Sequence, residues 1–288
     1  MNPMIKSMLE TYGTIRTAQD EKNALKEILQ KICLKGLHRH GFFEEAAFYG
    51  GTALRIMYGL ERFSEDLDFC SLTMDSQFKW ARYQTAVEQE LRLYGFDARF
   101  EAKKDESDHI VGSAFVKQST ANGLLVIESR SRAQKSELLQ VKLELDKSNP
   151  PGATFENKLL TQPEVFLIKT LDESSLFAGK MHAILARQFQ NRVKGRDYFD
   201  LVFYIQKKIR LNMVYLEAKL RQSGHYTDAG SLSISRLREM FLEKISNVDF
   251  KKAQDDVRPF VGPTQASSVS AWSRELFQAL AAELHAKE

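Results

Sequence analysis

Residues 48–69, FYGGTALRIMYGLERFSEDLDF, constrain the fold and chemistry of this 288-residue chain more than any other segment. A short apolar run leads into two glycines and a helical pattern, and an Asp-x-Asp pair follows that helix. Because alternate residues of a strand point to the same side, we expect Asp66 and Asp68 to share one face of a strand. Two carboxylates this close disfavour each other unless a cation lies between them. The segment therefore predicts a metal site and a phosphate site beside a glycine turn.

The residue types in this segment suit Mg²⁺ and a phosphorylated substrate. Magnesium takes one or two carboxylates and fills its other positions with water and substrate phosphates. We expect Gly50 and Gly51 to let the backbone approach a phosphate at the N-terminus of the following helix. Thr52 and Ser64 add hydroxyls that suit the same phosphate. Asp-x-Asp alone is more typical of an acidic strand face, so the prediction depends on the whole strand, turn, helix and strand assembly.

Bulk properties indicate an ordinary globular protein of one large domain or two medium ones, with 43% hydrophobic and 27% charged residues. No apolar run approaches the roughly 20 residues that span a bilayer. The N-terminal sequence lacks the apolar core of a signal peptide. Cys33 and Cys70 form neither a disulfide framework nor a Cys-x-x-Cys pair. We therefore expect a cytoplasmic protein with no membrane partner.

The hydrophobic pattern predicts an α+β fold. Helices are expected over much of the first 40 residues and at 52–58 and 80–94. The expected strands are 46–49, 63–70, 96–101, 110–117, 124–128 and 138–146. Asn122-Gly123 predicts a hairpin turn before the strand at 124–128. Past Pro163 the chain is expected to be helical, at 165–171, 174–190, 197–206, 211–222, 230–246, 250–255 and 267–286.

This order of elements predicts two domains. Residues 1–160 are expected to form an α/β domain with N-terminal helices around a mixed sheet. Residues 161–288 are expected to form an all-helical domain that completes the active site.

The second informative segment, SLFAGKMHAILARQFQNRVKGRDYFDL at residues 175–201, carries a basic motif. Lys180 and Arg187 are seven residues apart and share one face of a predicted helix. Residues 187–210 contain seven Lys or Arg against two Asp, which suits a polyanion or a nucleoside triphosphate. The last three basic residues of that range are equally typical of a solvated helix face.

Two motifs resemble one known family. Gly50-Gly51-Thr52-Ala53-Leu54, with Arg62-Phe63-Ser64-Glu65-Asp66-Leu67-Asp68-Phe69, resembles the first motif of the AbiEii/AbiGii toxin family. The Lys180-x-x-Ala helix, followed by Arg196-Asp197-x-x-Asp200-Leu, is similar to its later motif pair. The resemblance spans about residues 40–262. These toxins are DNA polymerase β-like nucleotidyltransferases of type IV toxin–antitoxin and phage-abortive systems.

The resemblance implies a specific reaction. An NTP is the substrate, its nucleoside monophosphate is transferred to an acceptor, and pyrophosphate is released. It also implies Mg²⁺ as the cofactor, with Mn²⁺ as an alternative, RNA and in particular tRNA as the acceptor, and a separately encoded antitoxin as the partner. The implied catalytic residues are Asp66, Asp68, Lys180 and Asp197. The residues expected to bind the nucleotide are Gly50, Gly51, Thr52, Ser64, Lys180, Arg187 and Arg196.

The same resemblance implies a third metal-binding carboxylate on a neighbouring strand. The segment LQVKLELD, at 139–146, alternates and places Lys142, Glu144 and Asp146 on one face. We expect Glu144, in mid-strand, to join Asp66 and Asp68 as a metal ligand, with Asp146 as the alternative. Alternating charge is also common on amphipathic strands that have no function.

Other interpretations stay open at this point. Asp197 suits an orienting or general-base role, and it also suits the first turn of a helix as a cap. A GTP- or NTP-binding regulator that transfers nothing to a macromolecule is a second function, and transfer to protein hydroxyls is a third. A metal hydrolase is disfavoured because His182 has no partner at metal-ligand spacing.

Overall fold

The structure is a computed structural model that describes residues 2–13, 15, 17–73, 78–102, 120–129, 137–188 and 193–287. Its described helices are α1 (Pro3–Glu10), α2 (Ala18–Arg39), α3 (Phe42–Glu45), α4 (Gly50–Tyr58), α5 (Ala81–Leu93), α6 (Glu173–Ala186), α7 (Gly195–Gln206), α8 (Met213–Gln222), α9 (Ile234–Ser246), α10 (Phe250–Val257), η1 (Arg258–Phe260), α11 (Pro263–Ser270) and α12 (Arg274–Ala282). Its described strands are β1 (Ala46–Tyr49), β2 (Leu67–Ser71), β3 (Asp97–Ala102), β4 (Thr120–Ser129), β5 (Glu137–Asp146), β6 (Phe155–Leu160) and β7 (Phe166–Leu171).

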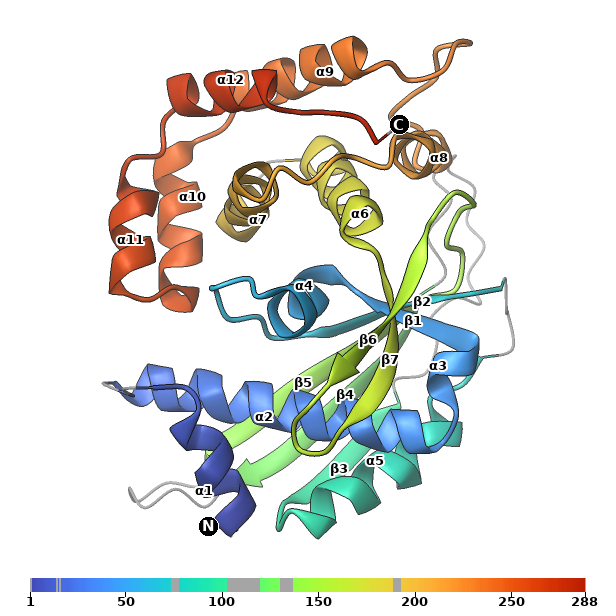
Figure 1. Cartoon of the computed structure of the whole chain (residues 1–288), viewed down its shortest axis with the longest axis vertical. Coiled ribbons are helices and arrows are strands. Elements are labelled where there is room, and N and C mark those ends of the chain that lie inside the picture. The colour runs from blue at the N-terminus through green and yellow to red at the C-terminus, as the bar shows by residue number, and fades with distance from the viewer. Residues whose placement is uncertain are drawn as a thin grey trace.

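The described strands form one mixed seven-stranded sheet in the order β3-β4-β5-β2-β1-β7-β6. The pairs β2–β5 and β1–β7 are parallel, and the other neighbours are antiparallel. Figure 1 shows the sheet with α1, α2 and α5 in one half of the molecule and α6 to α12 in the other. The α+β fold class predicted from the sequence is confirmed.

Two hydrophobic clusters lie in these two halves. The first packs α1, α2 and α5 on the sheet around several aromatic residues. Among these, the ring centre of Phe42 in α3 lies 4.8 Å from that of Phe69 in β2. The second fills the half formed by α6 to α12, which we term the helical half, and it includes Leu171 at the end of β7. Burial of this apolar surface is the main force that stabilises each half. The division into domains 1–160 and 161–288 stays a prediction. The β6–β7 hairpin runs across the boundary at residue 160, so β7 belongs to the same sheet as the preceding strands.

Three local contacts hold the segments of the helical half in place. Asp172 caps α6, its Oδ1 accepting a hydrogen bond from the Ser175 amide at 2.8 Å. Gly195 starts α7 where a Cβ atom would lie only 1.7 Å from the Ala253 carbonyl oxygen, so α7 packs closely on α10. At the far end of the chain, the Leu211 amide donates to the His285 carbonyl at 2.7 Å, which ties that segment to the helical half.

Several predicted elements are confirmed. The strand 46–49 is β1, and the helices at 52–58 and 80–94 correspond to α4 and α5. The second strand begins at Leu67 instead of residue 63, so Asp66 lies immediately before β2. The predicted strand at 110–117 lies outside the described residues.

Three predictions about secondary structure are wrong. Asn122 and Gly123 lie inside β4, opposite Glu144 and Leu143 of β5, because strand pairing overrides the local turn preference. Residues 166–171 form strand β7 and not a helix, since Phe166, Ile168 and Thr170 are buried with a period of two between β1 and β6. The helix predicted at 267–286 is divided into α11 and α12.

No described helix combines the length and the hydropathy that crossing a bilayer requires.

Candidate active site

The glycine turn predicted from the sequence lies directly against the acidic strand. Gly50 starts α4 with a φ of +81°, a backbone conformation that favours glycine. A Cβ atom on Gly50 would lie 2.3 Å from Asp68 Oδ2, and one on Gly51 would lie 3.0 Å from Ser64 Oγ. Any larger residue at position 50 therefore displaces the Asp68 carboxylate.

Asp66, Asp68 and Glu144 form what we term the carboxylate cluster. Asp68 of β2 lies opposite Glu144 in the parallel pairing with β5. Asp66 is held just before β2 because its backbone carbonyl accepts a hydrogen bond from the buried Thr52 hydroxyl of α4. Thr52 thus fixes the backbone of Asp66, and its contact with the nucleotide stays a prediction.

The carboxylate cluster carries an excess of negative charge. Burial, together with the nearby charges of Glu144 and Asp66, raises the pKa of Asp68 to about 7. Burial and the charges of Glu144 and Glu65 also raise the pKa of Asp66. Lys142 forms an ion pair with Glu144 and offsets part of this repulsion. The proton and a bound cation are therefore alternative ways to stabilise the cluster.

The chemistry of this donor set fits Mg²⁺. The Asp66 and Asp68 carboxylates are hard oxygen donors, and the ion completes its coordination with water and phosphate. Among the residues that the structure describes, no three His, Cys, Asp or Glu side chains have the spacing of a complete metal site. The site thus suits an ion that arrives with its own water or substrate oxygens.

Asp146, the alternative third carboxylate, lies elsewhere. Its Oδ1 accepts a hydrogen bond from the Ser148 amide at 3.0 Å, and its Oδ2 lies 3.7 Å from Lys219 Nζ. In the strand register it is opposite Cys70 and not Asp68. Asp146 therefore connects β5 to the helical half, and Glu144 is the β5 carboxylate beside Asp68.

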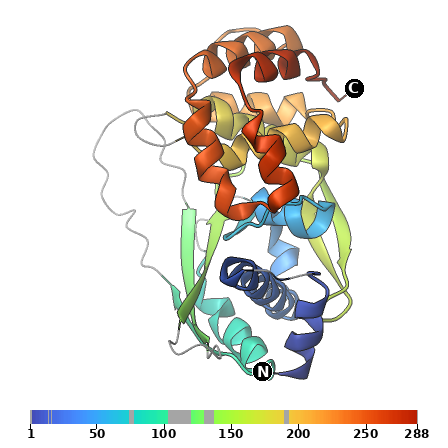
Figure 2. The ribbon, with the colours of Figure 1, turned by 90° about the vertical axis from the view of Figure 1, so that its left-hand side faces the viewer.

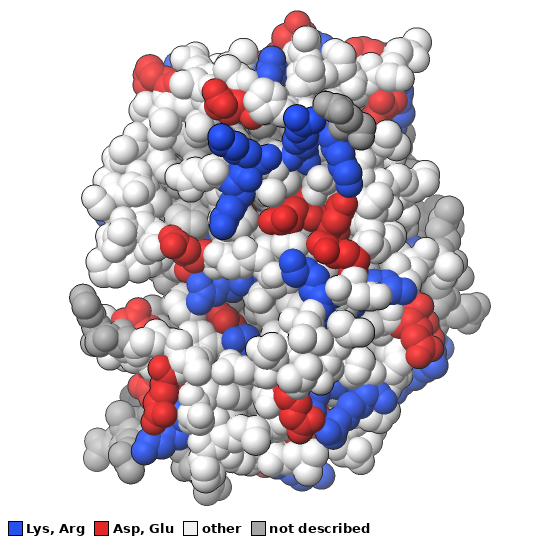
Figure 3. Space-filling view, in the orientation of Figure 1, with Lys and Arg blue, Asp and Glu red and all other residues white. Residues whose placement is uncertain are grey.

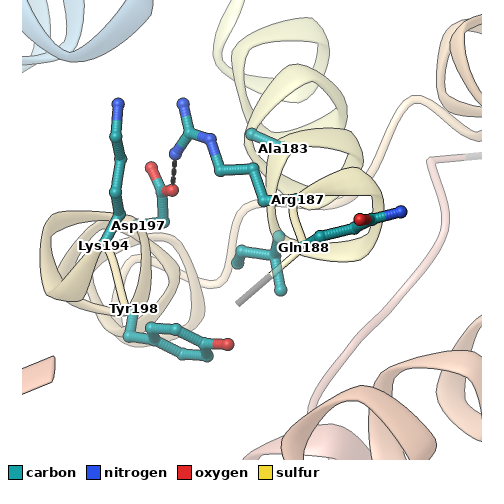
Figure 4. Close-up of a pocket in the computed structure, with 7 residues that line it drawn as sticks. Ala183, Arg187, Gln188, Lys194, Asp197 and Tyr198 are labelled. Atoms are coloured by element: carbon teal, nitrogen blue, oxygen red, sulfur yellow. Dashed lines mark ion pairs between the residues drawn. The ribbon is translucent and has the colours of Figure 1, made fainter. Parts of the chain in front are cut away.

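A second set of charges, which we term the ion-pair cluster, joins Arg62 of the α4–β2 connection to four residues of the helical half: Lys180, Arg187, Asp197 and Asp200. Lys180 Nζ of α6 lies 2.7 Å from Asp197 Oδ1 and 2.8 Å from Asp200 Oδ2, both on α7. Burial lowers the pKa of Lys180, while the charge of Asp200 opposes that shift. Arg187 pairs with the other oxygen of Asp197 (Figure 4).

Arg62 and Asp200 form a buried pair that the sequence analysis missed. Arg62 Nε donates to Asp200 Oδ1 at 2.6 Å and Nη2 donates to Oδ2 at 2.7 Å. Both residues are almost fully buried, with exposed fractions of 2% and 0%. Asp200 is one helical turn after Asp197, and this spacing places both carboxylates on one face of α7. The three-residue spacing of Asp197 and Asp200 is the sequence feature that could have indicated a shared role for Asp200.

Arg196 and Ser64 lie at the junction of the two halves. Arg196 Nη1 is 3.2 Å from Glu65 Oε2, and Lys26 of α2 is 3.0 Å from the other oxygen of Glu65. The Arg196 guanidinium also lies 4.3 Å from the ring centre of Phe260. Glu65, next to Ser64, therefore joins α2 to α7 across the site.

The two clusters meet at the glycine turn: a Cβ atom on Gly50 would lie 2.3 Å from Asp68 Oδ2, and one on Gly51 would lie 2.6 Å from Arg62 Nη2. The positive charge of Lys180 lowers the pKa of Asp68, against the larger effect of burial. Burial and the charge of Arg196 lower the pKa of Arg187, and the negative charge of Asp68 opposes that shift. Figure 3 shows acidic side chains near the middle of one face of the molecule, with basic side chains above and below them. His182 is not part of either cluster, because its Nε2 contacts Ser223 Oγ at 2.9 Å.

A pocket of about 270 Å³ opens beside the ion-pair cluster, between the end of α6 and the start of α7 (Figure 4). Its lining residues are Ala183, Ile184, Arg187, Gln188, Lys194, Asp197 and Tyr198. The sequence prediction included Arg187 and Asp197 of this lining, whereas Gln188 and Tyr198 carried no recognisable motif.

Two solved structures from Helicobacter pylori are similar to this chain. One solved structure, a Helicobacter pylori protein described as a nucleotidyltransferase, shares 16% identity, covers 93% of this chain and 99% of its own, and has a TM-score of 0.50. Another, JHP933 from Helicobacter pylori, shares 18% identity over 91% of this chain and 88% of its own, with a TM-score of 0.46. At such identity the first likeness supports the fold alone. No curated protein sequence matches the chain.

A family model for the nucleotidyl transferase AbiEii toxin of type IV toxin–antitoxin systems matches residues 32–282, which is most of the chain. The match includes the glycine turn, both clusters and the helices that carry them. The chain is therefore a nucleotidyltransferase that belongs to the AbiEii toxin family.

Proposed function

We propose that this enzyme transfers a nucleoside monophosphate from an NTP to RNA in a Mg²⁺-dependent reaction that releases pyrophosphate. The observation that supports this most directly is the position of Asp66, Asp68 and Glu144 opposite the cations Lys180 and Arg187. Carboxylates on one side and cations on the other suit a metal-bound triphosphate. The family also implies a separately encoded antitoxin as the partner.

Asp66 and Asp68 would hold the ion, with Glu144 as the further carboxylate. When bound, Mg²⁺ neutralises the charge of the phosphate oxygens and favours attack by the acceptor hydroxyl. The chain itself contributes the rigid placement of both aspartates, because Thr52 fixes the backbone of Asp66 and β5 supports Asp68.

The triphosphate would lie between the glycine turn and the ion-pair cluster. The first amides of α4, at Gly50 and Gly51, are at the positive end of a nine-residue helix. Ser64 Oγ is beside Gly51 and adds a hydroxyl donor. Lys180 would meet the phosphates as a point charge, and the guanidinium groups of Arg187 and Arg196 extend that positive side.

Asp197 would orient cations and not act as a general base. Its two carboxylate oxygens already contact Lys180 and Arg187. A carboxylate that is paired with two cations is a poor proton acceptor. This geometry favours an orienting role over both the base and the helix-cap alternatives.

RNA, with tRNA as the favoured class, is the proposed acceptor. The basic residues around the pocket supply contacts to phosphates, which position a nucleic acid without specifying its sequence. Binding through such contacts weakens as the salt concentration rises.

The test is to incubate the purified protein with Mg²⁺, total cellular RNA and each α-labelled NTP in turn. The expected result is labelled RNA with the wild type and none with Asp66→Ala/Asp68→Ala. The matched control is Glu239→Ala/Asp255→Ala, which removes two exposed carboxylates of the helical half. Label in protein would move the acceptor to a polypeptide. Bound NTP without any transfer would contradict the proposal and favour a nucleotide-binding regulator.

A further inference from the structure

Strand β6 forms one edge of the sheet. It pairs with β7, and among the described residues no second strand lies on its other side. Figure 2 shows the β6–β7 hairpin along one margin of the molecule. An edge strand presents backbone N–H and C=O groups that are ready to pair with another strand.

The same hairpin carries an exposed apolar surface. Leu159 is 56% exposed, Val165 67%, Leu167 51% and Phe155 39%. Leu159 and Leu167 are directly opposite each other in the β6–β7 register. Exposed apolar side chains gathered on one hairpin are typical of an interaction site. Unpaired backbone and exposed apolar side chains thus coincide on one short strand.

The sequence of β6, FENKLL, is complementary to itself in one antiparallel register. When Asn157 lies opposite Asn157 of a second copy, Phe155 lies opposite Leu159 and Glu156 lies opposite Lys158. Each of these pairs shares a face of the sheet, so apolar residues meet apolar residues and opposite charges meet. A register shifted by one residue places Glu156 opposite Leu159 and loses both pairings.

Tyr58 of α4 holds the two charged residues of β6 on one face. Its hydroxyl donates to Glu156 Oε1 at 2.7 Å, and Lys158 Nζ lies 4.0 Å from the centre of its ring. Both charges are therefore ordered before any partner arrives, which reduces the entropic cost of pairing. Phe155 and Leu159 are left on the opposite face.

We propose that β6 pairs edge to edge with β6 of a second copy of this chain, across a two-fold axis at Asn157. The two sheets then become one continuous sheet, held by main-chain hydrogen bonds and the Phe155–Leu159 contacts. The self-complementary charges favour a second copy over a different protein. This inference is independent of the proposed reaction.

The first test measures the mass of the full chain in solution over a range of protein concentrations. A species of twice the 33.0 kDa chain mass is expected at high concentration. Leu159→Lys should weaken this dimer by about 100-fold, because it removes, at two symmetric positions, a leucine that pairing would bury. Leu93→Lys is the matched control, since Leu93 is 68% exposed on α5 and should leave the dimer unchanged.

The second test is an oxidative cross-link. Asn157→Cys would place two thiols directly opposite each other, within the Cα separation of about 4.4–6.8 Å that a disulfide needs. A covalent dimer is expected in high yield. Lys158→Cys is the control, because its counterpart is displaced along the strand by two residues. The native Cys33 and Cys70 are buried and should not react.

Two results would overturn the proposal. One is a monomeric wild type at every concentration, which would leave the edge to a different protein. The other is a dimer that persists in Leu159→Lys while Asn157→Cys forms no cross-link, which would assign the dimer to another surface. Neither result bears on nucleotidyl transfer.

Discussion

The carboxylate cluster places like charges together, whereas in the ion-pair cluster each charge contacts an opposite one. Asp68 has Glu144 and Asp66 as neighbours, and burial with these charges raises its pKa to about 7. Asp200, in contrast, binds both Arg62 and Lys180, and these cations help to lower its pKa. The difference indicates that a bound proton or cation stabilises the carboxylate cluster, whereas the ion pairs within the ion-pair cluster stabilise that cluster.

The largest expected effect comes from removing a charge at the carboxylate cluster. Asp68→Asn should reduce nucleotidyl transfer by about 1,000-fold, since it removes a proposed metal ligand. The same change should raise the free energy of unfolding of the metal-free protein at alkaline pH, because it relieves repulsion. Labelled-RNA assays and chemical denaturation check the two effects. A variant that is both active and unstable would contradict the comparison.

The opposite result is expected at the ion-pair cluster. Asp200→Asn should lower the free energy of unfolding by about 3–5 kcal/mol, because it leaves the buried Arg62 without its charged partner. Asp255→Asn is the control, since the ion pair of Asp255 with Lys251 is exposed. That variant should change stability by less than about 0.5 kcal/mol. Equal losses of unfolding free energy in the two variants would show that the buried Arg62–Asp200 pair contributes no more to stability than an exposed ion pair.

The pH dependence of stability should also distinguish the clusters. The folded pKa of Asp68, about 7, exceeds its ordinary value of 3.8, so the folded protein holds this proton more tightly. The stability that this group contributes is fully present below pH 3.8 and is lost as the pH rises through about 7. The difference between these two pKa values corresponds to a loss of roughly 4 kcal/mol in the metal-free wild type.

Denaturation curves of the wild type and Asp68→Asn at several pH values measure this loss as a difference. The difference should shrink when Mg²⁺ is added, since the ion replaces the proton. A difference that does not change with pH would place Asp68 in a better-solvated environment.

The smallest effect concerns the third carboxylate. Glu144→Gln should weaken Mg²⁺ binding by about tenfold, because Glu144 lies opposite Asp68 in the strand register. Asp146→Asn should leave Mg²⁺ affinity unchanged, since Asp146 lies near Lys219. Titration calorimetry on folded protein measures both affinities. The reverse ranking would make Asp146 the third ligand.

The sequence was sufficient for elements that local signals delimit. Strand β1 was predicted from a short apolar run that ends at Gly50-Gly51, and helices α4 and α5 were predicted with stops at Gly59 and at Tyr94-Gly95. Residues 166–171 were not, since FLIKTL is apolar enough for either a strand or a helix. Its pairing with β1 and β6, far away in the sequence, decided between them.

The same distinction applies to the candidate site. Asp66 and Asp68 were found from their spacing along one segment, and the structure places them beside the glycine turn. The Arg62–Asp200 pair joins residues 138 positions apart, so no local pattern connects them. The sequence favoured Glu144 over Asp146 from its mid-strand position, and the register between β2 and β5 places Glu144 opposite Asp68.

The tie between the Leu211 amide and the His285 carbonyl has a consequence for the order in which the site is completed during synthesis. The core of the helical half includes Leu284, and this half carries Lys180, Arg187 and Asp197. A ribosome must therefore translate past Leu284 before these cations can be held opposite the aspartates. Under the proposed function, a nascent chain that has not yet reached Leu284 carries the carboxylate cluster without a completed core to hold Lys180, Arg187 and Asp197.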